Sequence, residues 1–159
     1  MATQTPDNML LDCYQRYVGD LEQVSEVDVY LGAGLTMGGL ALSMAGWIAF
    51  LWNETATHGT AQFFAVRELT IAAVGLGIPV FVLGTVAMLL GSDRVTALGV
   101  VGLAVSVAAV LLFVVTYPRA WDAPNQFNAP TGVFLYGVGL GALLFAAGAA
   151  YSCRVTGVR

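Results

Sequence analysis

The stretch from Arg67 to Leu90 reads RELTIAAVGLGIPVFVLGTVAMLL. After the adjacent charged pair Arg67–Glu68 it carries no further charge, and it is long enough to cross ~30 Å of hydrocarbon as a helix. It contains a Gly75-x-Gly77 pair and then Pro79, which removes one backbone hydrogen bond and should kink the helix. We predict a transmembrane helix at about 68–90, with a static kink and packing glycines rather than a moving hinge.

Three more runs of this kind occur, at about 30–52, 95–117 and 131–152. The chain is 58% hydrophobic and 10% charged, with a mean hydropathy of +0.78, whereas soluble domains have ~25% charged residues. The short turn at 91–94 makes the second and third spans antiparallel neighbours. We therefore predict an all-α integral membrane protein in which residues 30–159 form an antiparallel bundle of four transmembrane helices.

Residues 1–29 are the only extended polar segment. Apolar residues recur there at helical spacing from Leu10 to Val24. The polar face has Arg16 among several acidic residues, whereas a helix lying on anionic headgroups usually has a basic face. We expect an acidic amphipathic helix that packs on the bundle or on a protein partner.

The distribution of arginines predicts the orientation in the membrane. One side of the bundle has Arg16, Arg94, Arg154 and Arg159, and the other has Arg67 and Arg119. Because cytoplasmic loops carry the excess of basic residues, we predict a multi-pass protein of the cell membrane with both termini in the cytoplasm.

The net charge of the chain is −4, and all six of its basic residues are arginine. This acidic, lysine-free composition indicates a halophilic source. It argues against nucleic acid as a partner, because nucleic-acid binding requires a basic patch.

A charged cluster is expected on the outer side. Arg67 and Glu68 are adjacent, so they point about 100° apart on a helix and each needs another partner. Arg119 follows the third span at the same depth. We predict a Glu68–Arg119 ion pair with Tyr117 or Trp121 placed for a cation–π contact. It would be a structural clamp between two spans or a recognition surface for a partner.

Small residues four apart allow helix backbones to approach closely. Such pairs occur at Gly34-xxx-Gly38, Gly39-xxx-Ser43 and Gly137-xxx-Gly141, and Gly75 and Gly77 are further candidates for helix packing. We predict packing within the bundle, and a face for a homo-oligomer is the alternative.

The loop expected at 53–66 holds a formal glycosylation triplet, Asn53-Glu54-Thr55, and the only histidine, His58. The triplet abuts a span, so we expect it to be unused. We expect His58 to be solvated rather than a ligand.

Between the ends of the predicted spans there is no Asp, Glu, Lys, Arg or His. Ion-coupled carriers need charged groups at membrane depth, haem and metal sites need His or Cys ligands, and a nucleophile needs a base. We therefore expect no catalytic, cofactor or metal site, and a protein that is not an enzyme.

The order of several motifs carries a family resemblance. Arg67–Glu68 opens a span, Gly75-Leu76-Gly77-Ile78-Pro79 lies in its middle, and Tyr117-Pro118 with Trp121 follows the next span. This order, across roughly residues 30–152, resembles the four-span N-terminal membrane domain of the haloarchaeal cell division protein A family and related haloarchaeal membrane proteins of unknown function.

The resemblance implies a non-enzymatic membrane anchor that helps recruit division components such as FtsZ and small PRC-barrel proteins. In that family a flexible cytoplasmic tail follows the membrane domain. This sequence ends at Arg159, so we expect only the role of the membrane domain to apply.

Two functions follow from these observations. The first is an anchor or assembly module whose partners are the lipid bilayer, other membrane or division proteins, and further copies of the chain. The alternative is an oligomeric channel for a small neutral solute, with a pore between protomers that uses the kink at Pro79.

Overall fold

The computed structural model describes residues 26–54, 58–89, 93–121 and 127–156. The described part consists of four helices, without strands: α2 (Glu26–Asn53), α3 (Ala61–Leu89), α4 (Asp93–Thr116) and α5 (Asn128–Thr156). Each helix is long and apolar enough to cross a membrane. The predicted all-α, four-span architecture is therefore confirmed, whereas the expected N-terminal amphipathic helix falls outside the described residues.

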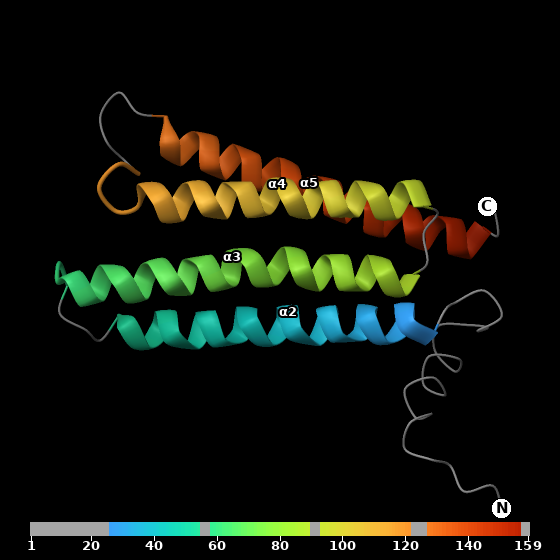
Figure 1. Cartoon of the computed structure of the whole chain (residues 1–159), viewed down its shortest axis with the longest axis horizontal. Coiled ribbons are helices and arrows are strands. Elements are labelled where there is room, and N and C mark those ends of the chain that lie inside the picture. Colours follow the sequence, from blue (N-terminus) through green and yellow to red (C-terminus); the bar gives the residue numbers. More distant parts are fainter. Residues whose placement is uncertain (1–25, 55–57, 90–92, 122–126, 157–159) are drawn as a thin grey trace, which may run out of the picture.

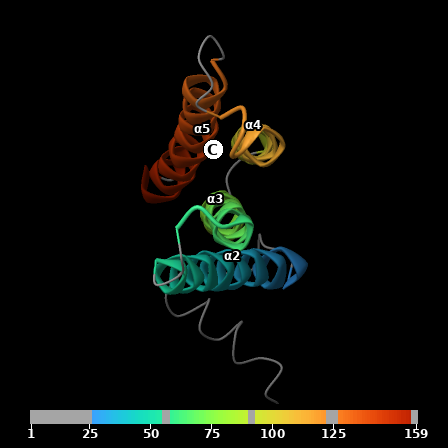
Figure 2. The same ribbon diagram turned by 90° about the vertical axis from the view of Figure 1, so that its left-hand side faces the viewer.

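The helices form two antiparallel hairpins, α2–α3 and α4–α5 (Figure 1). Seen end-on, α3 lies at the centre, with α2 on one side and α4 and α5 on the other (Figure 2). This arrangement puts the start of α2, the end of α3, the start of α4 and the end of α5 at one end of the bundle. The 53–61 and 116–128 connections lie at the opposite end.

Helix α3 begins earlier than the sequence suggested. Residues 61–66, expected in a loop, are helical, and the hydroxyl of Thr60 accepts a hydrogen bond from the backbone N–H of Phe63 at 3.1 Å. A threonine in this position caps a helix by satisfying one of its free N–H groups. The helix then runs without interruption through Pro79, whose ring is fully buried, to Leu89.

Small residues at seven-residue spacing join α2 to α3. They are Gly32, Gly39 and Gly46 on α2, facing Gly84, Gly77 and Thr70 on α3. A Cβ atom placed on each α2 glycine would lie 3.1, 2.6 and 3.0 Å, respectively, from the carbonyl oxygen of its partner. The two backbones are thus in contact along the whole seam, which only small residues permit.

The α4–α5 hairpin repeats the central contact of the first. A Cβ on Gly77 would lie 2.7 Å from Gly39 O and 2.8 Å from Ser43 N. A Cβ on Gly139 would lie 2.7 Å from both Gly102 O and Ser106 N.

Both serines satisfy their hydroxyls inside their own helix. Ser43 donates to Gly39 O at 2.9 Å and Ser106 donates to Gly102 O at 3.0 Å. Each hairpin is therefore closed by a glycine of its second helix resting on a Gly-xxx-Ser step of its first.

The second hairpin packs on a separate face of α3. Pro79, Val82 and Val86 are buried on this face. A Cβ on Gly75 would lie 3.0 Å from Val110 Cγ2, and one on Gly99 would lie 3.2 Å from Leu83 Cδ1. Helix α3 is therefore covered on two faces by small-residue contacts and apolar side chains.

The predicted packing glycines divide into two groups. Gly75 and Gly77 contact neighbouring helices, whereas Cβ atoms placed on Gly34, Gly38, Gly137 and Gly141 would have no atom of another helix within 4 Å. Consecutive residues point about 100° apart, so Gly38 and Gly39 cannot both face α3. The use of the outward glycines between copies of the chain stays a prediction.

Replacing Gly39 by leucine should force α2 away from α3, because its Cβ would meet the backbone of Phe81 and Gly77. Overpacking of this kind costs about 1–3 kcal/mol. We expect a lower midpoint of thermal unfolding in detergent for Gly39→Leu and little change for the matched Gly38→Leu. Equal midpoints for the two variants would show that the seam does not hold the hairpin.

Candidate functional site

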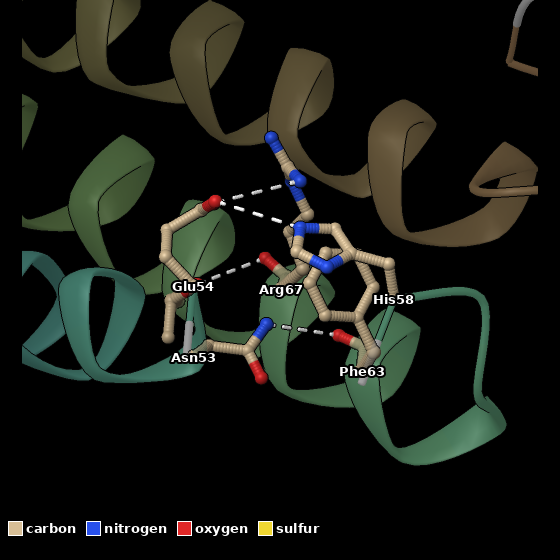
Figure 3. Close-up of polar contacts among 6 residues, drawn as sticks. Asn53, Glu54, His58, Phe63 and Arg67 are labelled. Atoms are coloured by element: carbon tan, nitrogen blue, oxygen red, sulfur yellow. Dashed lines mark hydrogen bonds and ion pairs between the residues drawn. The ribbon is translucent and has the colours of Figure 1, made fainter. Parts of the chain in front are cut away.

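Two ion pairs and a buried hydrogen bond lie where α2 meets α3, at the end of the bundle with the 53–61 connection (Figure 3). Arg67, near the start of α3, lies with Nη1 3.7 Å from Glu54 Oε1. Its Cζ is 5.1 Å from the ring centroid of Phe50 and 5.5 Å from that of Phe63. The guanidinium is therefore held by one carboxylate and by two aromatic faces, a favourable setting for a cation at the edge of a membrane.

Asn53 joins the two helices by a buried hydrogen bond. Its side chain is at the end of α2, only 6% of the residue is exposed, and Nδ2 donates to Phe63 O at 3.1 Å (Figure 3). Glycan attachment would replace one of the two protons on this nitrogen with a bulky group, for which a residue buried to this extent leaves no room. This geometry supports our prediction that the Asn53-Glu54-Thr55 triplet is unused.

His58 lies on the outside of the same cluster. Its Nε2 is 3.9 Å from Glu54 Oε2, and its ring centroid is 4.8 Å from that of Phe63. The side chain is largely exposed, and no group of three or more His, Cys, Asp or Glu suited to a metal ion occurs among the described residues. The neighbours of His58 are thus a carboxylate and an aromatic ring.

A chain of aromatic contacts runs from this cluster to the second hairpin. The ring centroids are 5.6 Å apart for Phe63–Phe64, 6.2 Å for Phe64–Tyr117, 4.9 Å for Tyr117–Phe113 and 5.0 Å for Phe113–Trp121. Edge-to-face and offset pairs at such distances are favourable. Both Tyr117 and Trp121 were predicted to belong to the site: Tyr117 links the hairpins through its contact with Phe64, and Trp121 packs on Phe113 within the second hairpin.

The predicted Glu68–Arg119 ion pair is absent from the described part of the chain, where Arg67 pairs with Glu54 instead. The predicted cation–π contact of Arg119 with Tyr117 or Trp121 is replaced by that of Arg67 with Phe50 and Phe63. The reason is proximity: α2 and α3 touch along their whole length, so the last residues of α2 reach Arg67.

Part of this cluster could have been predicted from the sequence. Phe63 and Arg67 are four residues apart, which places them on one face of a helix, but this spacing has meaning only if the helix begins before Phe63. With residues 53–66 assigned to a loop, that relation and the contribution of Glu54 were missed. Phe50 is contributed by α2 and depends on the antiparallel pairing.

An apolar cavity of about 180 Å³ lies between α3, α4 and α5. Its wall includes Ile71, Gly75, Val110, Trp121 and Tyr136. The hydroxyl oxygen of Tyr136 is buried without a hydrogen-bond partner. Such a lining suits an apolar group better than a polar solute.

The family comparison covers nearly the whole chain. A family model described as "Cell division protein A, N-terminal domain" matches residues 8–156, a range that contains all four helices. No curated protein and no solved structure matches the chain.

Substituting Arg67 should weaken the bundle more than substituting Arg119. Arg67→Gln removes an ion pair and two cation–π contacts, each of about 0.5–1 kcal/mol at partly exposed positions. Arg119→Gln removes a charge from an exposed residue. Thermal unfolding in detergent should rank Arg67→Gln below Arg119→Gln, and the reverse order would restore the importance of Arg119.

Asn53→Ala should destabilise the α2–α3 hairpin by about 0.5–1.5 kcal/mol, because it removes the hydrogen bond from Asn53 to the carbonyl of Phe63. Thr55→Val also removes the glycosylation triplet but leaves Asn53 intact, so it is the matched control. We expect only Asn53→Ala to lower the midpoint of thermal unfolding. The Thr55→Val variant purified from native membranes should differ in mass from the unsubstituted chain only by the substitution itself. A mass loss with Thr55→Val would show that Asn53 is glycosylated.

Proposed function

The chain belongs to the cell division protein A N-terminal domain family, and we propose that it is a non-enzymatic membrane anchor or assembly module for division proteins. It is a multi-pass membrane protein related to cell division by its family. The anchoring role, its partners and its orientation are the parts that we add.

One observation carries this proposal: the described interior of the bundle is occupied by helix–helix contacts rather than by ionisable side chains. The buried polar residues of the described chain are Asn53, Thr70 and Ser106. The side-chain donors of all three hydrogen-bond to backbone carbonyls. Transport of ions and acid–base catalysis both need ionisable groups at depth, whereas an anchor needs only stable spans.

The two ends of the bundle suit different environments. Arg94 lies at the end of the bundle where α2 begins and α5 ends, and Arg67 and Arg119 lie at the other end. The arginine count of the whole sequence therefore supports a cytoplasmic position for both termini. In this orientation the acidic segment 1–25 meets cytoplasmic division proteins, and the cluster around Arg67 faces outward.

The acidic, lysine-free composition supports a source that lives in concentrated salt. We therefore place the test in the membranes of a halophilic archaeon, where the chain would meet its own division proteins at working salt concentration.

Deletion of residues 7–28 should separate anchoring from recruitment. We expect the tagged full chain to co-purify with identified division proteins, and the deletion variant to remain in the membrane but lose them. A control with residues 7–25 in scrambled order keeps length and charge and should also lose the partners, because an ordered binding face is needed. Retention of the partners by both variants would contradict the role of this segment.

Flux through liposomes distinguishes the anchor from the channel. Vesicles containing the purified chain should pass glycerol no faster than empty vesicles. Protein-dependent flux that Pro79→Ala changes would favour the oligomeric channel instead.

A further inference from the structure

The two hairpins share one sequence motif and the helix contact that it makes. Residues 39–50 read GLALSMAGWIAF and residues 102–113 read GLAVSVAAVLLF, with six identical positions of twelve. The shared glycine and serine are the ones that close each hairpin, and Gly77 and Gly139 occupy the same place against them. Position 39 therefore corresponds to position 102, and position 77 to position 139.

In the first hairpin, the second helix has two occupied faces. One face of α3 receives α2 through Gly77. The other receives the second hairpin: Gly75 meets Val110, and Pro79, Val82 and Val86 are buried. Through this second face of α3, the first hairpin binds the second hairpin.

The corresponding face of α5 is open. The counterparts of these α3 residues are Gly137, Gly141, Leu144 and Gly148. Leu144 is 56% exposed, the adjacent Phe145 is 70% exposed, and Cβ atoms on the three glycines would have no atom of another helix within 4 Å. Helix α2 of the same chain cannot cover this face, because it lies on the far side of α3 (Figure 2).

The counterpart of Val110 is also exposed. This residue is Trp47 on α2, and it is 54% exposed. Val110 fills the space over Gly75, so Trp47 of another molecule would lie over Gly137.

We propose that the open face of α5 binds the α2 face of a second copy of this chain, as α3 binds the second hairpin within the chain. We identify the partner from the repeat, because the equivalent face of α3 binds the second hairpin; the small residues alone would not identify it. The two surfaces in contact are different, so the copies join head to tail and form rows or closed rings. This contact needs no division protein, so its failure would leave the proposed recruitment role standing.

Cysteine cross-linking in lipid tests this contact. The full chain carries Cys13→Ser and Cys153→Ser, and two preparations, one with Gly137→Cys and one with Trp47→Cys, are mixed, reconstituted and oxidised. We expect a disulfide-linked dimer in the mixture and none from either preparation alone. Replacing Gly137→Cys by Leu111→Cys, on an exposed part of α4 toward the same end, should lower the yield several-fold.

A second measurement keeps the proposal testable if Trp47→Cys folds poorly. Gly137→Leu adds a side chain where the single chain has open space, so thermal unfolding in detergent should be unchanged. Single-molecule photobleaching in vesicles should shift from several copies to one. Three results would each overturn the proposal: equal cross-linking from Leu111→Cys, cross-linking of Gly137→Cys with itself, or single copies for the unsubstituted chain at every protein-to-lipid ratio.

Discussion

The contact of Gly77 with Gly39 and Ser43 is the constraint on which the rest of the structure depends. Lipid tails are as apolar as leucine, so two helices in a bilayer gain little from hiding apolar surface and must gain from close packing. Here the packing is backbone against backbone, with a Cβ on Gly77 only 2.7 Å from Gly39 O. Pairs above and below at seven-residue spacing extend the contact along both helices.

The same seam positions the polar cluster. Antiparallel register is fixed where Gly39 meets Gly77, and this register sets the end of α2 beside the first turns of α3. Asn53 then reaches the carbonyl of Phe63, and Glu54 reaches Arg67. The cluster is thus a consequence of helix packing, and the charges add modest stability to an arrangement that the glycines determine.

Much of the fold could be predicted because the bilayer restricts what a chain can do. A run without charges must be helical in lipid, and its length gives the number of spans. Helix ends were harder to predict: α3 starts at Ala61 because Thr60 caps it, although Arg67 and Glu68 suggested that the span began there. Spacing could not decide between the Gly34–Gly38 pair and the Gly39–Ser43 pair, since each is a good packing motif by itself.

The missing information was the relation between helices rather than the character of any one of them. Gly32, Gly39 and Gly46 share a seven-residue period with Thr70, Gly77 and Gly84, and only this pairing selects the inward face of α2. The partner of Arg67 was missed for the same reason. Glu54 is thirteen residues away in the sequence, and the packing of α2 on α3 brings it close. Where paired helices meet at backbone and small side chains, the residues of one helix therefore identify it as a span but do not identify its neighbour.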